Sequence, residues 1–314
     1  MKGSVKSHIK QAIPSLVIMV FMVGAASAMS SRFFTAANLR NVLTQTAVLA
    51  IVSAAQCFAL LIGGIDMSVS SVISVSTIFV AMFSHSGPAG LAFAIALALA
   101  VGAFTGFVNG MGIVRFQIPA MIITISTQAF LKGIALILMP SSGGKVNQAF
   151  VKVIKTRVGI FSVAFLLAVL TYASAWLVLH YTRFGRRIYA VGNGELYAEQ
   201  SGIDTKKITV MVYVLSGLIA AFGGIILSAR ISSGNPLVGD SYAMDSVAAA
   251  VIGGISMNGG VGTIAGTLSG AVILTLINNI MNSMGISPYY QYILKGALLM
   301  FSLMLFQIKR RRTV

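Results

Sequence analysis

The sequence has very little negative charge and only one cysteine. Of its 314 residues, 6 are Asp or Glu and 22 are Lys or Arg, and charged residues make up 9% of the chain, far below the roughly 25% of soluble domains. A lone cysteine, Cys57, excludes an intramolecular disulfide and a metal site built from cysteines. The three histidines are scattered, with no His-Glu-x-x-His spacing, so we expect no metal centre.

Motifs of common catalytic sites are absent as well. The nearest approach to a phosphate-binding Gly-x-x-x-x-Gly-Lys-Ser/Thr loop is the run 143–146, Gly-Gly-Lys-Val, which lacks the hydroxyl residue and the leading glycine spacing. No Gly-x-Ser-x-Gly turn of a serine hydrolase occurs. We therefore expect no catalytic residues and no ATP hydrolysis by this chain alone, so that it is not an enzyme.

Hydrophobic residues make up 57% of the chain, and its mean hydropathy is +0.92. They occur in runs of about twenty, the length of a helix that crosses roughly 30 Å of hydrocarbon, and strand-like alternation is absent. We predict an all-α polytopic membrane protein, one transmembrane domain over residues 1–314, with about ten transmembrane helices and short broken or re-entrant segments. The expected spans are 13–29, 43–62, 67–84, 89–113, 117–139, 158–181, 208–229, 245–257, 262–283 and 289–307. Because 67–84 is Ser-rich and 245–257 is short, eight full spans plus re-entrant pieces remain open.

The net charge of +16 is explained by basic residues that flank the spans on the cytoplasmic side, so we expect membrane lipid and no nucleic acid as a partner. Ten spans from a cytoplasmic N-terminus place Arg115, the loop 182–207 and the basic C-terminal tail inside. The loop 140–157 would then lie outside, although it carries four Lys or Arg residues.

Small residues recur at helical spacing. Gly102 and Gly106, and likewise Gly262, Gly266 and Gly270, are four residues apart, which predicts helices that pack closely through these positions. The stretches GGIDMSVS at 63–70 and GGISMNGG at 253–260 resemble each other. This echo suggests a duplicated architecture of the kind found in transporters.

Half of the carboxylates lie in one polar stretch, 189–207, as Glu195, Glu199 and Asp204. Its glycines predict short helices joined by turns at the cytoplasmic surface. Glu195 and Glu199 are four residues apart and would share one helix face. The residues alone leave two interpretations open, an anchor for a partner protein and an ordinary solvated loop.

Several polar residues fall inside the expected spans or beside them. Amides that face a pore would suit a hydroxyl-rich solute, and hydrogen bonding between helices is the equal alternative. Asp66 is expected to cap the next helix or stabilise a gate, with direct substrate contact as the alternative. Lys132 within a span either extends to the interface or serves a partner, and Asp240 and Asp245 either meet a partner at the outer face or lie in a solvated loop. Our candidates for the translocation path or gate are Gly63, Gly64, Asp66, Asn109, Gln128, Asn278 and Asn279.

The stretch GRRIYAVGNGELYAEQSGIDTKKI, residues 185–208, resembles the cytoplasmic loop of permease subunits from ribose-type ATP-binding-cassette importers. The stretches at 33–48, 63–74 and 249–273 are similar to further family motifs in the same order. By this resemblance, residues 182–207 form a coupling loop that docks on the ATP-binding subunit. The implied contact residues are Gly192, Glu195, Tyr197, Ala198, Ser201 and Gly202. The loop has Gly-Asn-Gly-Glu at 192–195 where the family usually has Gly-Gly-Asn-Glu, which points to a dedicated ATP-binding subunit.

The resemblance further implies a multi-pass subunit of the bacterial inner membrane that imports a small polar solute such as a pentose or hexose. Its expected partners are a separate ATP-binding subunit, a periplasmic solute-binding protein, and a second permease copy or a paralogue. ATP and Mg²⁺ would bind to the ATP-binding subunit, and this chain itself is expected to bind no cofactor. The alternative is an ion-coupled secondary transporter, which needs a titratable group at the midplane; Asp66 is the one candidate.

Overall fold

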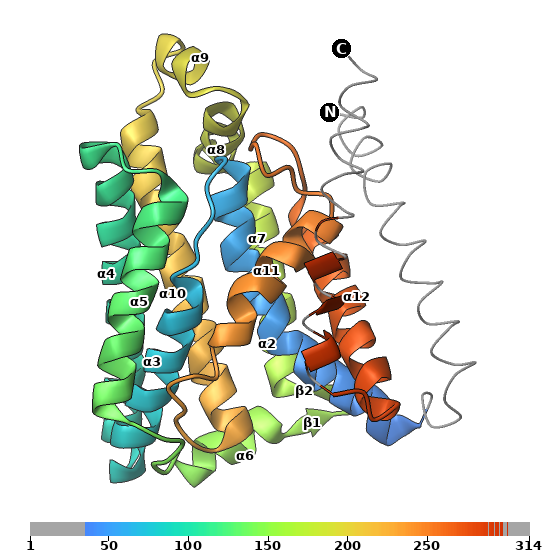
Figure 1. Cartoon of the computed structure of the whole chain (residues 1–314). Helices are drawn as coiled ribbons and strands as arrows, with labels where there is room; N and C mark the ends of the chain where they lie inside the picture. The colour runs from blue at the N-terminus through green and yellow to red at the C-terminus, as the bar shows by residue number, and fades with distance from the viewer. Residues whose placement is uncertain (1–34, 288, 292, 295, 298–299, 301–314) are drawn as a thin grey trace.

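The computed structural model describes residues 35–287, 289–291, 293–294, 296–297 and 300, and these form an almost entirely helical protein (Figure 1). The predicted all-α class is confirmed. A short antiparallel hairpin of β1 (Arg157–Val158) and β2 (Phe161–Ser162) precedes α7. The helices are α2 (Ala36–Leu61), α3 (Val69–Phe83), the 3₁₀ turn η1 (Ser84–Ser86), α4 (Pro88–Phe116), α5 (Ala120–Leu138), α6 (Gln148–Lys155), α7 (Val163–Tyr181), α8 (Arg183–Asn193), α9 (Glu195–Gln200), α10 (Thr205–Ile231), α11 (Asp240–Ile252) and α12 (Ile264–Ser283).

Seven helices of the described part are long and apolar enough to cross a membrane: α2, α3 with η1, α4, α5, α7, α10 and α12. The predicted spans 13–29 and 289–307 lie wholly or largely outside the described residues, so the total of about ten is not confirmed. The segment predicted at 245–257 is not a full crossing. Helix α11 begins earlier, at Asp240, and its 13 residues extend about 20 Å, which is short of the roughly 30 Å hydrocarbon core.

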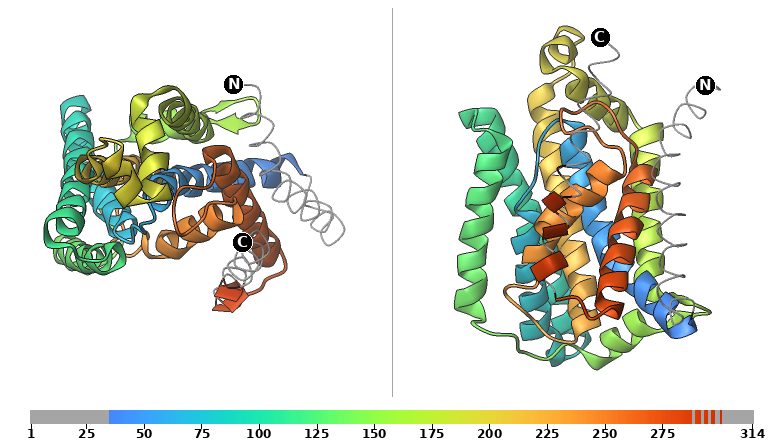
Figure 2. Two further views of the ribbon diagram at one scale, coloured as in Figure 1. Left: turned by 90° about the horizontal axis from the view of Figure 1, so that it is seen from above. Right: turned by 45° about the vertical axis from the view of Figure 1, so that its right-hand side comes forward.

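The connections divide between the two ends of the helical bundle. Helices α8 and α9 and the turn between α4 and α5 lie at one end, which we call the α8–α9 end, and α6 with the β-hairpin lies at the opposite end (Figures 1 and 2). The predicted alternation therefore holds: Arg115 and the loop 182–207 share one end, and the loop 140–157 lies at the other.

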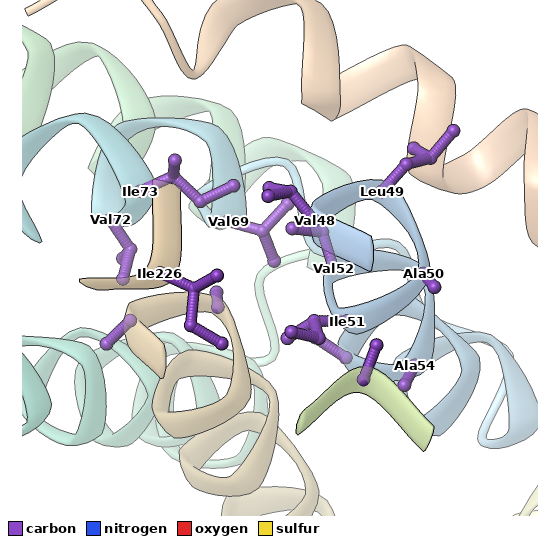
Figure 3. Packing of buried hydrophobic residues seen from close by; sticks show 14 of the residues in the cluster. Val48, Leu49, Ala50, Ile51, Val52, Ala54, Val69, Val72, Ile73 and Ile226 are labelled. Atoms are coloured by element: carbon purple, nitrogen blue, oxygen red, sulfur yellow. The ribbon is translucent and has the colours of Figure 1, made fainter. Parts of the chain in front are cut away.

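Helix α2 is the centre of the core. Its residues from Thr46 to Leu61 are all buried, because apolar and small side chains cover every face of this part of the helix. Figure 3 shows side chains of this helix, including Ile51 and Val52, packed beside Val69 and Ile73 of α3 and Ile226 of α10. Helices α4, α5 and α7 lie outside this core and expose large apolar side chains such as Phe104, Phe130 and Leu170, as expected of surfaces in contact with lipid.

Glycines bring pairs of helices into backbone contact, as the four-residue spacing predicted. A Cβ at Gly102 would overlap the carbonyl of Gly217, and one at Gly106 would overlap the carbonyl of Tyr213, so α4 and α10 touch without intervening side chains. Helices α11 and α12 are joined in the same way through Gly253 and Gly266. Van der Waals contact of this kind holds membrane helices together where lipid removes the hydrophobic drive to associate.

The chain enters the bundle twice as a non-helical segment. Residues 62–68 lead from the end of α2, near α8, back to the start of α3, and residues 232–239 lead from the end of α10, at the opposite end, to the start of α11 (Figure 1). Helices α3 and α11 therefore both begin inside the bundle.

Hydrogen bonds along α3 fix the course of the segment 232–239. The amide of Asn235 donates to Thr77 Oγ1 over 3.1 Å, and the amide of Gly239 donates to Ser74 Oγ over 3.0 Å. Gly239 then lies against the carbonyl of Ser70, where a Cβ would overlap it. The first turns of α3 and α11 thus meet within the bundle.

Candidate functional site

Helix α8 lies across one end of the bundle as an amphipathic helix. Thr182 caps it, because its Oγ1 accepts a hydrogen bond from the Gly185 amide over 3.1 Å. Gly185 packs against the last carbonyls of α7, so only glycine permits this sharp turn between the helices. The side chains of Ile188 and Val191 are buried against the core, while the basic residues Arg183, Arg186 and Arg187 are exposed.

Helix α8 is attached to both loops that carry the repeated glycine motif. A Cβ at Gly192 would overlap the Leu61 carbonyl, and the amide of Gly260 donates to that same carbonyl over 2.9 Å. The Tyr189 hydroxyl donates to the Gly262 carbonyl over 3.0 Å. Burial raises the pKa of Tyr189, so its hydroxyl stays protonated and remains a donor. A displacement of α8 must therefore act on the segments 62–68 and 253–263 together.

The two glycine motifs share the way in which they end a helix. Gly63 and Gly254 both have positive φ, +79° and +91°. The amide of Gly63 bonds to the Leu60 carbonyl and that of Gly254 to the Val251 carbonyl, each three residues back, and the next amide in each case bonds five residues back. This is the Schellman cap, which requires a left-handed residue. Both motifs therefore end a helix with the same C-cap. The structural equivalent of Gly63 is Gly254, whereas the sequence similarity aligns Gly63 with Gly253.

Helix α9 presents the acidic stretch to solvent. Glu195, Leu196 and Tyr197 are exposed, the last two by 63% and 72%, and Glu195 stands in the first turn, where the helix dipole favours a carboxylate. Ala198 is buried against the core of the chain, and its carbonyl accepts the amide of Ile203 over 3.1 Å.

The six residues predicted to contact the ATP-binding subunit therefore divide into two groups. Glu195, Tyr197, Ser201 and Gly202 are exposed, as a contact surface requires. Gly192 and Ala198 instead face the chain itself. The helix faces that carry Gly192 and Ala198 pack on the bundle, so a partner cannot reach them. These two residues position α8 and α9 instead.

Two of the three carboxylates of this stretch have structural partners. Asp204 caps α10 by accepting the Lys207 amide over 2.9 Å. Glu199 accepts the Thr205 hydroxyl over 2.8 Å. As predicted, Glu195 and Glu199 share a face of α9, and both line a cavity of about 790 Å³. The other walls of this cavity are the α4–α5 turn, the segment 62–64 and residues of α10 that include Lys206 and Tyr213.

Asp66 is the centre of a buried polar network. Its Oδ1 accepts the amide and the hydroxyl of Ser68 over 3.1 and 2.6 Å, and its Oδ2 accepts the hydroxyl of Ser216 over 2.7 Å. The side-chain amide of Gln56 pairs with the backbone of Asp66: its nitrogen donates to the Asp66 carbonyl, and its oxygen accepts the Asp66 amide. Asp66 is fully buried and holds the turn before α3, whereas the N-cap position itself belongs to Ser68.

The network extends through the two amides predicted for the path or gate. Asn109 donates to Ser68 Oγ over 2.9 Å and accepts the Thr127 hydroxyl over 2.7 Å. Gln128 donates to Ser70 Oγ over 3.0 Å. Side chains of α2, α4, α5 and α10 are thus hydrogen-bonded around the start of α3, and buried polar groups satisfied in this way specify one arrangement of the helices.

Gly63 and Gly64 lie beside this network. Tyr213 of α10 packs so closely over Gly64 that a Cβ there would overlap its hydroxyl. The Tyr213 hydroxyl is buried and has no hydrogen-bond partner within the described part of the chain.

Asn278 and Asn279 do not join the other path candidates. Asn279 of α12 pairs with Asn38 at the start of α2 through two reciprocal amide hydrogen bonds of 3.1 and 2.9 Å. Asn38 and Asn279 both lie near the ends of helices remote from α8. For Asn279 the structure therefore selects hydrogen bonding between helices. The Oδ1 atom of Asn278 is buried and has no hydrogen-bond partner among the described residues.

Sequence reasoning missed Gln56, Ser216 and Tyr213. Gln56 and Ser216 each interrupt an apolar run, and that interruption is the signal that could have identified them. Tyr213 carried no signal, because a tyrosine in an apolar span is common at helix contacts. In the part of the chain that the structure describes, no three His, Cys, Asp or Glu side chains come close enough to hold a metal ion.

Comparison with known proteins places this geometry in a family. Residues 38–303 match the family described as "Branched-chain amino acid transport system / permease component". The chain is 36% identical over 304 residues to the ribose import permease protein of Escherichia coli strain K12, with 92% of each chain covered. It is 35% identical to the ribose import permease protein of Bacillus subtilis, with 92% of this chain and 90% of the relative covered.

A further relative is the galactose/methyl galactoside import permease protein of Escherichia coli strain K12, 29% identical with 94% of each chain covered. No solved structure matches the chain. The family match and the apolar helices together identify a multi-pass protein of the inner membrane. The chain belongs to this permease family, as a transmembrane subunit of the ribose-type ATP-binding-cassette importers that its loop motif resembles.

Proposed function

We propose that this chain carries a monosaccharide, a pentose or a hexose, across the inner membrane as the permease subunit of its importer. The relatives named for ribose and for galactose support this substrate class. The chain contains no phosphate-binding loop, so the energy has to come from a partner. ATP and Mg²⁺ would bind to a separate ATP-binding subunit, and a periplasmic solute-binding protein would deliver the sugar to a pair of permease subunits.

The attachment of α8 to both glycine-motif loops, 62–68 and 253–263, carries the proposed mechanism. In this proposal the α8–α9 end faces the cytoplasm, and the ATP-binding subunit holds α9 through Glu195, Leu196 and Tyr197. Closure of the ATP-binding subunits would displace α9, and α8 would pass the displacement to the segments 62–68 and 253–263. A partner can drive such a change only if it binds two positions of α9 with different affinity. The cavity between α9 and the α4–α5 turn gives α9 room for a second position.

An ion-coupled transporter is not favoured. That mechanism needs an ion-binding or titrating group on the path, whereas the one candidate, Asp66, is fully buried and is hydrogen-bonded to Ser68 and Ser216. Relatives named as import permeases also favour the importer.

Uptake into proteoliposomes tests the proposal. The permease would be reconstituted with an ATP-binding subunit and a solute-binding protein of the same importer, and uptake of labelled ribose and galactose would be measured. We expect uptake that requires ATP, stops with vanadate and persists when ionophores collapse ion gradients. Uptake that follows the ion gradients and ignores vanadate would select the secondary transporter.

A further inference from the structure

An ion pair joins α5 to the first residue of α11. The Nζ atom of Lys132 lies 2.7 Å from Oδ2 of Asp240. The two side chains are 38% and 40% exposed, in contrast to the buried polar network around Asp66.

This ion pair lies within the thickness of a membrane. Helix α5 has 19 residues and is therefore about 29 Å long, close to the roughly 30 Å of a hydrocarbon core. Lys132 precedes the last residue of α5, Leu138, by about 9 Å of helix rise. Asp240 follows Gly239, which is bonded to Ser74 inside the bundle. Lys132 thus lies inside the span of α5, and Asp240 begins α11 within the bundle.

Charged side chains at this depth are costly in lipid and normally face a cavity or a polar partner. The lipid-facing character of the chain is visible elsewhere on α5, where Phe130 and Ile137 are exposed by 70% and 82%. The ion pair of Lys132 and Asp240 bridges α5 and α11, and the pairing leaves much of both side chains uncovered. We therefore expect this face to be in contact with water in the assembled importer.

The residues around the pair can bind hydroxyl groups. Gln128 stands one turn before Lys132 and is partly exposed, with its amide nitrogen on Ser70 Oγ. Met244 stands one turn after Asp240 and is 55% exposed. We call Gln128, Lys132, Asp240, Ser241 and Met244 the α5–α11 face. It combines a cation, a carboxylate, an amide and a hydroxyl with one apolar side chain.

We propose that the α5–α11 face lines the water-filled path and that Lys132 and Asp240 contact the passing sugar. A sugar hydroxyl both donates and accepts hydrogen bonds, so adjacent hydroxyls can accept from the ammonium group and donate to the carboxylate. The ion pair closes on itself when no sugar is present. Brief exchange between these partners gives recognition without tight binding, which conduction requires. The ligand class rests on the proposed monosaccharide transport, whereas the water-lined face does not.

Cysteine labelling tests whether the face is in water. The native chain has one cysteine, Cys57, which is fully buried and serves as the silent background. The variants Met244→Cys and, as the matched control on the lipid side, Phe130→Cys would be treated in the assembled importer with a charged, membrane-impermeant thiol reagent. We expect at least tenfold faster labelling of M244C than of F130C. Equal labelling of the two positions overturns the proposal.

Uptake by charge variants tests the sugar contact. We expect Lys132→Met and Asp240→Asn each to lower the rate of ribose uptake at least tenfold, and the exchange K132D/D240K to recover part of it. The control is Lys152→Met, because Lys152 is exposed on α6 and is not part of the α5–α11 face. Wild-type uptake by K132M, in chains with wild-type thermal stability, overturns the contact. Labelling needs no sugar, so failure of monosaccharide transport and failure of the water-lined face are distinguished.

Discussion

Gly192 of α8 lies directly against the carbonyl oxygen of Leu61, with no space for a side chain between the two residues. The same carbonyl also accepts the amide of Gly260. At this contact α8, the end of α2 and the second glycine motif meet, so a substitution here tests the proposed mechanism directly.

Replacing Gly192 with alanine should lift α8 from the bundle. The added methyl overlaps the Leu61 carbonyl and approaches the Gly260 amide, and overpacking of this kind costs about 1–3 kcal/mol. We expect a lower unfolding temperature together with weaker stimulation of ATP hydrolysis by the loaded binding protein. The matched control is Gly133→Ala in α5, where the new methyl meets no neighbouring atom within 4 Å. Equal behaviour of the two variants contradicts the attachment of α8.

Charge reversal at Glu195 should uncouple the importer without unfolding it. Glu195 is exposed, and exposed substitutions usually change stability by less than about 0.5 kcal/mol. We expect Glu195→Arg to keep its unfolding temperature and to lose most ATP-dependent uptake, because the proposed contact with the ATP-binding subunit is lost. Lys152→Glu, at the opposite end, is the charge-reversal control. Full uptake by E195R would remove Glu195 from the contact.

Removing the carboxylate of Asp66 should destabilise the chain in graded steps. In Asp66→Ala the Ser68 amide and the hydroxyls of Ser68 and Ser216 lose their acceptor, and each buried group left unsatisfied costs about 1–3 kcal/mol. Asp66→Asn keeps one acceptor oxygen, so it should fall between the wild type and D66A. A thiol-reactive dye can follow unfolding, because Cys57 becomes reactive only when the core opens. D66A with wild-type stability would show that the network does not hold the helices.

Removal of the Tyr189 hydroxyl should weaken the attachment of α8. Tyr189→Phe loses the hydrogen bond to the Gly262 carbonyl, worth about 1 kcal/mol. Because the folded-state pKa of Tyr189 is raised, this contribution is fully present below the ordinary tyrosine pKa of about 10 and is lost as the pH rises above it. The difference in stability between wild type and Y189F should therefore be constant from about pH 6 to 9. Tyr181→Phe, at an exposed tyrosine, is the control and should show no difference.

Long apolar runs and glycine spacing were sufficient to predict the helical class, most of the spans and close helix packing through Gly102 and Gly106, but not that the partner is α10. The start of α11 was missed, because Asp240 and Ser241 look like loop residues by hydropathy. What makes them helical is the packing of Gly239 on Ser70, a contact between segments that are distant in the sequence.

The candidate site shows the same division. The sequence predicted short helices in the acidic stretch, which depend on neighbours within a few residues, whereas the predicted N-cap role of Asp66 was wrong, because Ser68 occupies that position. It did not predict that Ala198 faces the core or that Ser216 and Asn109 complete the network around Asp66 and Ser68. Those relationships arise from the crossing of separate helices, and no local pattern encodes them.

Because the Leu61 carbonyl contacts both Gly192 and Gly260, the two glycine motifs move together when α8 is displaced. Leu61 and Gly260 belong to opposite parts of the sequence, yet one short helix rests on both. One displacement of α8 in each subunit would therefore move the turn before α3 and the loop before α12 at the same time.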